Sequence, residues 1–321
     1  MAPLLEVEDL RIHFRTDDGL VRAVDGISFG LERGRTLGIV GESGSGKSVT
    51  SMGIMGLHQG TKAEITGHIR LDGEDLVTAT PNRVRELRGS KMAMIFQDPL
   101  SSMHPYYTVG DQIIEAYRVH NKVSKQVARK HAVDLLGRVG IPTPQTRVDD
   151  YPHQFSGGMR QRAMIAMALS CDPELLIADE PTTALDVTVQ AQILELIKDL
   201  ATTMGTTVVL VTHDLGVVAS LCDKVVVLYG GRIMESGPAD EIFGNPQHPY
   251  TKGLLESTPR LDEQVHGKLH TIPGQPPSLT RPSPGCPFEP RCEYRKDICK
   301  TVRPEIQSRD GRTVACHEVR L

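Results

Sequence analysis

The sequence lacks any apolar run long enough to cross a bilayer. Its longest uninterrupted apolar stretches, such as Val208 to Val211 and Val225 to Tyr229, fall far short of the roughly 18 to 20 residues that a membrane-spanning helix needs. The N-terminus also lacks a basic segment and reaches Glu6 and Glu8 almost at once, which is unlike a secretory signal. We therefore expect a cytosolic chain that reaches any membrane only through partners.

Tryptophan is absent, no internal repeat is visible, and neither sign of charge dominates. The 36 Lys and Arg residues stand against 40 Asp and Glu residues, for a net charge of −4, which argues against binding of nucleic acid through its phosphate backbone. A hydrophobic content of 39% and 30 glycines are typical of an ordinary globular chain. The 321 residues leave room for a nucleotide-binding unit of about 250 residues and a smaller addition.

Alternating apolar residues at the N-terminus predict an antiparallel β structure. They run from Leu5 to Phe14, and a turn-like TDDG segment at residues 16–19 precedes a second strand-like run. A short apolar run, Thr36 to Val40, then leads through a glycine-rich loop into a helix-compatible stretch. The order strand, glycine loop, helix is typical of a phosphate-binding site.

The middle of the chain is predicted to place helices between buried strands. Residues 99–155 have helical spacing, with Ser124 available as an N-cap. The apolar runs Leu175 to Asp179 and Val208 to Thr212 fit buried parallel strands. The helical pattern between these two runs stops at Gly205.

The composition changes toward the C-terminus. Gly230 and Gly231 lie between two strand-like runs and predict a two-residue hairpin. Seven of the 21 prolines lie between Ile272 and Cys292, so regular structure should fade there. We predict a nucleotide-binding domain over residues 1–255 and an extension over residues 256–321.

The segment GESGSGKS at residues 41–48 matches the Walker A pattern. Its glycines let backbone N–H groups turn toward phosphate oxygens, Lys47 reaches the β and γ phosphates, and Ser48 ligates Mg²⁺. A chance glycine-rich turn is the alternative. The residues expected to contact the nucleotide here are Gly41, Ser43, Gly44, Ser45, Gly46, Lys47, Ser48 and Val49.

Two carboxylates end the apolar run at residues 175–179. Asp179 is suited to holding Mg²⁺, and Glu180 could polarise a water molecule for attack on the γ phosphate. An acidic pair at a strand end is often only a polar terminus, but its combination with the Walker A pattern favours catalysis.

Four further segments carry a family resemblance. FSGGMRQR at residues 155–162 resembles the signature motif of ATP-binding cassette proteins, and AMIFQDP around Gln97 resembles the Q-loop. TTALD ending at Asp186 resembles the D-loop, and VTHD around His213 resembles the switch histidine. With NPQHPYTKGLL at residues 245–255 and the cysteine-containing tail, the chain resembles the D-type ATPase subunit of bacterial dipeptide and oligopeptide importers over essentially its whole length.

The resemblance implies an α/β fold. It consists of a P-loop ATP-binding cassette with an antiparallel β subdomain, a helical signature subdomain at about residues 99–170, and a small cysteine-containing extension. It also implies that Gln97 senses Mg²⁺ and the attacking water, that His213 contacts the γ phosphate, and that Phe14 stacks on adenine. Asp186 of the D-loop is expected to contact the nucleotide as well. Phe14 also continues the alternation of the first strand and could simply belong to the core.

Ser156, Gly157 and Gly158 open a predicted helix and so form a second anion site. One chain cannot use both anion sites on one nucleotide. The resemblance implies a head-to-tail pair of subunits, in which each ATP lies between the Walker A segment of one subunit and the signature of the other. Met159 replaces the more general glutamine of the signature, a change that we expect to be tolerated.

Four cysteines crowd the last 36 residues. Four thiolates suit either a tetrahedral zinc site or one iron–sulfur cluster, although the close C-x2-C pairs of zinc ribbons are missing. The resemblance favours a [4Fe-4S] cluster over zinc. The predicted ligands are Cys286, Cys292, Cys299 and Cys316.

The resemblance therefore predicts an ATPase that energises import of dipeptides or oligopeptides from the cytoplasmic face of the inner membrane. Its expected partners are a second ATPase subunit of a distinct F-type, two membrane-spanning permease subunits and a solute-binding protein, with no nucleic acid. A transporter of nickel or a glycoside, and a soluble ATP-binding cassette protein acting on DNA or ribosomes, are the alternatives. The acidic balance and the single nucleotide domain disfavour the soluble protein.

Overall fold

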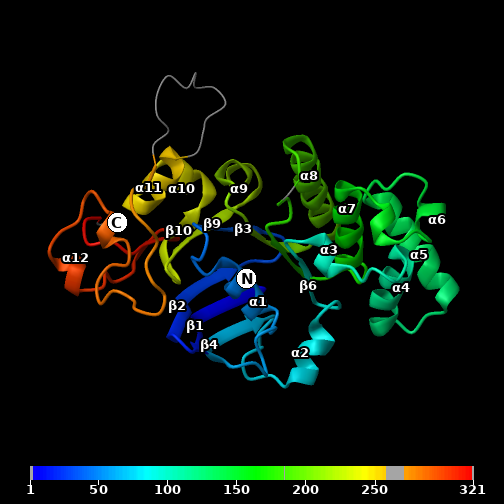
Figure 1. The fold of residues 1–321 in the computed structure, drawn as a ribbon, viewed down its shortest axis with the longest axis horizontal. Coiled ribbons are helices and arrows are strands. Elements are labelled where there is room, and N and C mark those ends of the chain that lie inside the picture. The colour runs from blue at the N-terminus through cyan, green and yellow to red at the C-terminus, as the bar shows by residue number, and fades with distance from the viewer. Residues whose placement is uncertain (1–2, 184, 258–270, 320–321) are drawn as a thin grey trace. The chain divides into compact units, whose positions relative to one another are not determined.

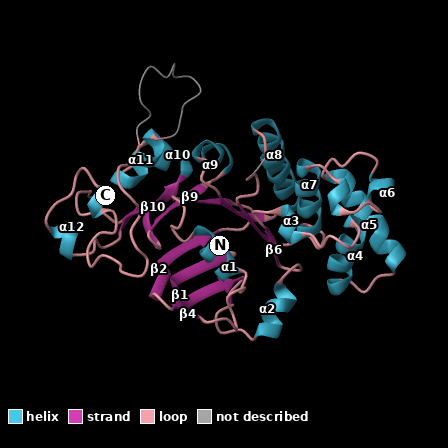
Figure 2. Ribbon diagram, viewed as in Figure 1, coloured by secondary structure: helices cyan, strands magenta, loops and turns pink. Residues whose placement is uncertain are grey.

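The computed structural model describes residues 3–183, 185–257 and 271–319, and the chain divides into two compact units (Figure 1). The first unit is built mainly from residues 79–211. The second unit is built from residues 5–31, 36–78 and 212–321. Each unit combines strands with helices (Figure 2), so the predicted α/β class is confirmed.

The second unit begins with an antiparallel sheet in the order β2-β1-β4-β5. Strands β1 (Leu5–Thr16) and β2 (Gly19–Leu31) form a hairpin, and Thr16 pairs with Gly19 across its two-residue turn. Strand β4 (Ala63–Leu71) pairs with β1, and β5 (Glu74–Asp75) extends the sheet. The predicted TDDG turn and antiparallel start are confirmed.

Strand β1 follows the predicted alternation with one interruption. Leu5 and Val7 are buried, as are Leu10 and Ile12. The spacing between the two buried pairs is therefore three residues instead of the two that strict alternation requires. Asp9 has a φ of 43° at this point, and the register of β1 shifts against both neighbouring strands. A β-bulge of this kind inserts one extra residue and returns the following side chains to the same face.

The second unit also contains β3 (Thr36–Val40), which runs parallel to β9 (Lys224–Tyr229). Strand β10 (Arg232–Pro238) returns antiparallel to β9 through Gly230 and Gly231. The two glycines have φ values of 55° and 75°, as a two-residue turn with positive φ at both central positions requires. The predicted hairpin is confirmed.

The C-terminal part of this unit adds two short strands to the edge of β10. Strand β12 (Arg312–Val314) pairs with β10, and β11 (Gln307–Arg309) pairs with β12. The sequence did not indicate these strands. Between residues 271 and 292 the described chain is irregular apart from one short 3-10 turn, as the proline content predicted. The helices of the unit are α1 (Lys47–Ile54), α9 (Leu215–Leu221), α10 (Ala239–Gly244), α11 (Pro249–Glu256) and α12 (Ile298–Thr301).

The first unit is built around three parallel strands in the order β8-β7-β6. They are β6 (Met92–Ile95), β7 (Leu175–Asp179) and β8 (Thr207–Val211), and every residue in them is buried. Continuous burial explains why these strands, apart from Asp179 and Thr207 at strand ends, are apolar instead of alternating. The predicted buried strands are confirmed, with β8 beginning one residue earlier than the apolar run.

Helices fill the segment of the chain between β6 and β7. Ser124 caps α5 by accepting the N–H of Val127 at 3.3 Å, and Gly205 ends α8 in the left-handed conformation, both as predicted. Helices α4, α5 and α7 pack against one another (Figure 1). The helices are α2 (Pro81–Leu87), α3 (Pro99–Ser102), α4 (Val109–His120), α5 (Lys125–Arg138), α6 (Pro144–Arg147), α7 (Gly157–Ala168) and α8 (Val187–Met204). Within the described parts of the chain, none of the helices combines the length and hydrophobicity of a membrane span.

Candidate functional site

The glycine-rich loop of the second unit joins β3 to α1. Gly41 has a φ of 150°, and a Cβ atom added there would lie 2.2 Å from the carbonyl oxygen of Leu228. Gly46 has a φ of 104°, and a Cβ there would lie 2.4 Å from the carbonyl oxygen of Ala23. Both contacts are closer than any side chain tolerates, so glycine is required at these positions.

Lys47 begins α1 and folds back over this loop. Its side chain is buried, and its Nζ donates to the carbonyl oxygens of Gly41 at 2.8 Å and Glu42 at 3.1 Å. Ser45 is also buried, and its hydroxyl has no hydrogen-bond partner among the described residues. A cationic amine, a buried hydroxyl and closely packed backbone therefore meet in one loop, a donor set that fits phosphate.

Ser48 and Val49 follow Lys47 in the first turn of α1, and both are half-buried. Ser43 and Gly44 lie at the exposed outer part of the loop. The structure thus places the predicted Walker A residues in a single strand–loop–helix element. Their contacts with nucleotide remain predictions.

Two other predicted residues of the second unit lie outside the loop. Phe14 of β1 is half-buried and packs edge-to-face on His58, with ring centroids 5.2 Å apart. Its partial exposure leaves both of its predicted roles open. His213 is exposed and directly precedes Asp214, which caps α9 by accepting the N–H groups of Gly216 and Val217.

The first unit brings two predicted catalytic residues together. Gln97 follows β6 and Glu180 follows β7, and the parallel pairing of Ile95 with Ala178 brings the carboxyl ends of both strands to one edge. The Nε2 of Gln97 donates to Glu180 Oε2 at 3.0 Å. Asp179, the last residue of β7, is 3% exposed. The sequence named these residues, but only the strand pairing brings Gln97 to Glu180.

Glu180 accepts a second hydrogen bond that the sequence analysis missed. The hydroxyl of Thr183 donates to the same Oε2 atom at 3.0 Å. Glu180 also has a φ of 45°, and strained positive φ at a non-glycine residue is concentrated at functional sites. The sequence offered one signal for this contact, because Thr183 carries a hydroxyl and lies three positions after Glu180.

The signature residues lie at the N-terminus of α7. Ser156 is exposed and caps the helix by accepting the N–H of Met159 at 3.3 Å. Gly157 and Gly158 form the first helical turn, and a Cβ on Gly158 would lie 3.1 Å from the side chain of Val189. The exposed helix start retains the features of an anion site.

Asp186 of the predicted D-loop has a structural partner. It caps α8 by accepting the N–H of Val189 at 3.0 Å. Ala184, in the same TTALD segment, lies outside the described residues. A contact of Asp186 with nucleotide remains a prediction.

The four C-terminal cysteines are free thiols that lie near one another. Cys286 donates its backbone N–H to the carbonyl oxygen of Cys299 at 2.8 Å. Burial, with a smaller contribution from the nearby Cys299, Cys316 and Cys292, raises the pKa of Cys286 to about 12. The described residues contain no set of three or more His, Cys, Asp or Glu side chains arranged to hold a metal ion. The thiols therefore gather in one region without forming a preassembled ligand set.

Comparison with known families gives two matches in separate parts of the chain. Residues 24–183 match the family described as ABC transporter. Residues 234–299 match the family described as oligopeptide/dipeptide transporter, C-terminal region.

Individual proteins similar to this chain extend the match over nearly its full length. The dipeptide transport ATP-binding protein DppD of Bacillus subtilis is 52% identical over 319 residues, covering 98% of this chain and 95% of the relative. The oligopeptide transport ATP-binding protein OppD of Salmonella typhimurium is 50% identical, covering 98% and 93%. Among solved structures, the ATP-binding cassette MJ0796 bound to ADP and Pi is 25% identical with a TM-score of 0.66, covering 73% of this chain and 98% of that one.

Proposed function

Since this chain belongs to the ATP-binding proteins of ABC transporters with the oligopeptide/dipeptide C-terminal region, we propose that it hydrolyses ATP to drive peptide import. The observation that carries this proposal is the hydrogen bond from Gln97 to Glu180 at the end of β7. This hydrogen bond holds the side-chain amide of Gln97 against the carboxylate of Glu180, the second acidic residue at the end of β7. Two relatives of about 50% identity are named for dipeptide and oligopeptide transport.

ATP binding is assigned to the loop between β3 and α1. Backbone N–H groups of residues 41–46 surround the phosphates, and Lys47 transfers its hydrogen bonds from the loop carbonyls to phosphate oxygens. Phe14 stacks on the adenine. The buried hydroxyl of Ser45, which has no hydrogen-bond partner in the described part of the chain, supports this assignment because it has donor capacity available for a ligand.

Mg²⁺ would be held by Ser48, Asp179 and Gln97. The ion supplies charge neutralisation between phosphate groups when it is bound. Glu180 holds the attacking water by accepting its proton, and Gln97 orients that water. His213 donates to the γ phosphate. This division of roles requires one basic carboxylate, and the hydrogen bonds from Gln97 and Thr183, which orient the Glu180 carboxylate, support its assignment to Glu180.

Hydrolysis is proposed to require a second ATPase subunit. The exposed N-terminus of α7, with Ser156, Gly157 and Gly158, binds the nucleotide held by that partner. Asp186 lies at the same subunit boundary. The partner is a distinct subunit of the F-type.

The complete assembly contains two membrane-spanning permease subunits and a solute-binding protein. The chain acts at the cytoplasmic face of the inner membrane as a peripheral subunit. Import of nickel or a glycoside is the alternative within the transporter class, and a soluble ABC ATPase is the alternative outside it.

The C-terminal extension is proposed to hold a [4Fe-4S] cluster on its four cysteines, with zinc as the alternative. The proximity of Cys292, Cys299 and Cys316 to the Cys286 thiol supports this assignment. Metal binding would deprotonate the thiols and lower the cost of burying them together. The bound centre supplies a cross-link for a segment with little regular structure.

Copurification tests the proposed transport function. The tagged full-length chain is expected to carry permease subunits and a second ATPase from membranes, and ATP turnover of the reconstituted complex should rise with a peptide-loaded binding protein. If nickel or a glycoside raised the ATP turnover and peptide did not, the proposed peptide cargo would be contradicted. An ATPase recovered without membrane partners would contradict the transporter.

A further inference from the structure

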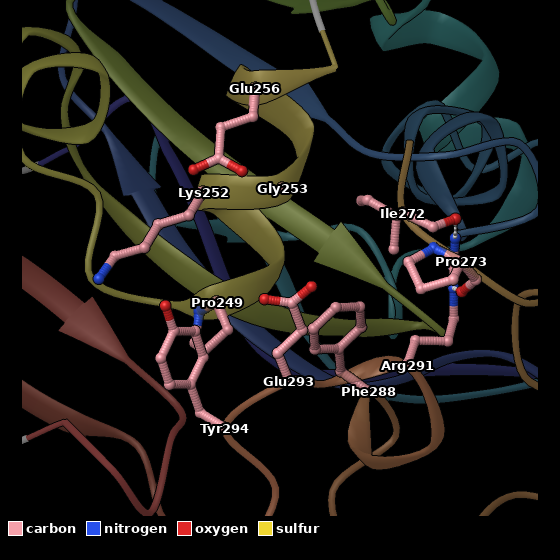
Figure 3. A pocket seen from close by; sticks show the side chains of 10 residues that line it. All are labelled: Pro249, Lys252, Gly253, Glu256, Ile272, Pro273, Phe288, Arg291, Glu293 and Tyr294. Atoms are coloured by element: carbon pink, nitrogen blue, oxygen red, sulfur yellow. Dashed lines mark hydrogen bonds between the residues drawn. The ribbon is translucent and has the colours of Figure 1, made fainter. Parts of the chain in front are cut away.

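A cavity of about 90 Å³ lies beside the buried side chain of Arg291 in the second unit (Figure 3). Helix α11 forms one wall through Pro249 and Gly253, and the C-terminal extension forms the other through Pro273 and Phe288. Arg291 directly precedes Cys292 of the cysteine site. The extension therefore brings a cation into the interior of the unit at this point.

The guanidinium of Arg291 forms five hydrogen bonds. Its Nη1 and Nη2 donate to the two carboxylate oxygens of Glu42 at 2.6 and 2.9 Å. The remaining donors reach the Tyr229 hydroxyl at 3.2 Å and the carbonyl oxygens of Ile272 and Pro273 at 3.2 and 2.9 Å. A guanidinium has five N–H donors in a fixed plane, so all of them are used. Lysine has three donors and cannot reproduce this fork.

Glu42 is the second residue of the phosphate loop, and each of its polar groups is held. Its carboxylate accepts from Arg291, its N–H donates to the Tyr250 hydroxyl at 2.9 Å, and its carbonyl oxygen accepts from Lys47. Arg291 and Tyr250 both come from the C-terminal third of the chain. The loop is thus fixed by distant parts of the same unit as well as by its own glycines.

Aromatic packing holds these groups in place. The rings of Tyr229 and Tyr250 have centroids 4.5 Å apart, and each lies 5.3 Å from the ring of Phe288. The Arg291 guanidinium also lies 5.7 Å from the centre of the Tyr229 ring. Its side chain is 5% exposed and that of Glu42 is 24% exposed, so the ion pair is screened by salt less than a fully exposed pair would be.

We propose that Arg291 is a positioning residue for the phosphate loop, through which the C-terminal extension sets the affinity for ATP. This inference rests on the proposed role of the loop in ATP binding. Arg291 holds Glu42, and Glu42 holds the backbone and the Lys47 amine before nucleotide arrives. A loop that is already ordered loses less conformational entropy on binding.

The coupling is reciprocal. If docking of the extension favours ATP binding, ATP must favour docking of the extension by the same factor. ATP should therefore slow hydrogen exchange in residues 271–292 of the wild-type chain. The effect should disappear when Arg291 no longer holds Glu42.

Arg291→Lys and Arg312→Lys form a matched pair of test variants. Arg312 is similarly buried in the extension, where it pairs with Glu235 at 2.6 Å, but within the described residues it forms no hydrogen bond to the phosphate loop. Calorimetry on the full-length chain, with EDTA present to prevent hydrolysis, should show about tenfold weaker ATP binding for Arg291→Lys. Arg312→Lys should bind ATP as the wild type does. Equal losses in both variants, or none in Arg291→Lys, would overturn the proposal.

Glu42→Gln tests whether Arg291 acts through Glu42. Arg291→Lys should weaken ATP binding much less in the Glu42→Gln background than in the wild type, and additive effects would contradict the coupling.

Should Arg291→Lys fail to fold, Tyr250→Phe tests the same loop contact, because it removes only the hydroxyl that accepts from the N–H of Glu42. Unchanged ATP affinity in Tyr250→Phe would then reject the proposal. If the wild-type chain binds no ATP, both the proposed function and this inference are contradicted. If the wild type binds ATP and the variants bind it equally well, only this inference is contradicted.

Discussion

Glu180 combines a backbone φ of 45° with hydrogen bonds from Gln97 and Thr183. A positive φ costs free energy at a residue with a side chain, of order 1 to 3 kcal/mol. That cost is tolerated where the surrounding structure demands one side-chain direction. Here the two donors converge on a single carboxylate oxygen, Oε2.

The residue-scale prediction concerns Glu180→Gln. The amide preserves the shape of the side chain but loses the basicity of the carboxylate, so ATP turnover should fall by about a hundredfold or more while ATP binding is retained. Steady-state phosphate release and equilibrium ATP binding measure the two properties separately. Glu174→Gln is the control, because that carboxylate pairs with Arg33 and Lys91. Near-normal turnover in Glu180→Gln would remove Glu180 from the proposed role.

At the scale of elements, three helices begin at a side chain that caps the helix N-terminus. Ser156 caps α7, Ser124 caps α5 and His248 caps α11, in each case by accepting a backbone N–H. The three caps share this hydrogen bond to the backbone, but they differ in solvent exposure. The α7 start is exposed, whereas His248 is 1% exposed.

Helix α7 gives the second prediction. Ser156→Arg should leave ATP binding at this chain's own loop intact and should block ATP-dependent association with the partner ATPase, because a bulky cation fills the proposed anion site. Ser124→Arg removes the equivalent cap of α5 and controls for the loss of about 1 kcal/mol of stability that either change causes. Light scattering with and without ATP reports association. Unchanged association of Ser156→Arg would contradict the shared-site arrangement.

Helix α11 gives a prediction about pH. Burial lowers the pKa of His248 to about 3 from an ordinary value of 6.5. Between these values the unfolded chain binds a proton that the native chain excludes, so the free energy of unfolding should fall as the pH decreases below about 6.5, by up to about 1.4 kcal/mol per unit. Urea unfolding at several pH values measures this slope.

His248→Asn should flatten that slope. Asparagine retains an acceptor for the N–H of Tyr250 and does not titrate. His153→Asn, at an exposed position, should leave the slope unchanged. If both variants retained the wild-type slope, His248 would not be its source.

At the scale of the whole molecule, the C-terminal extension is built into the unit that carries the phosphate loop. The Arg22 N–H donates to the Leu279 carbonyl oxygen at 3.0 Å, and β12 extends the sheet beyond β10. A buried ion pair joins Arg312 to Glu235. The boundary predicted near residue 255 stays a prediction, since residues 258–270 lie outside the described residues.

The last prediction concerns Cys292→Ser. Anaerobically purified wild-type protein should be brown and contain about four iron atoms per chain. The variant should lose iron and become more sensitive to protease after residue 255, while ATP binding through Lys47 is mostly retained. Cys171→Ser, which alters a thiol of the other unit, should keep its iron. Colourless protein with one zinc ion per chain would contradict the cluster, and metal-free protein with an equally protected extension would contradict any metal site.

Local features of the fold were predictable because they depend on neighbouring residues. The alternation of β1, the turn at residues 16–19, the Ser124 cap and the Gly205 stop follow from backbone conformational preferences and side-chain periodicity. The family resemblance was also predictable, because its motifs are short segments in a fixed order. The comparisons confirm the family.

Contacts between distant residues were decided by tertiary structure. Glu180 is 83 positions from Gln97, and Arg291 is 249 positions from Glu42. Neither spacing follows a helix or strand period, so no sequence pattern predicts these contacts. The parallel pairing of β6 with β7 creates the first contact, and docking of the extension creates the second. The sequence by itself determined which chemical groups are present, whereas strand order and burial determined which of them meet, because a hydrogen bond depends on distance in space and not along the chain.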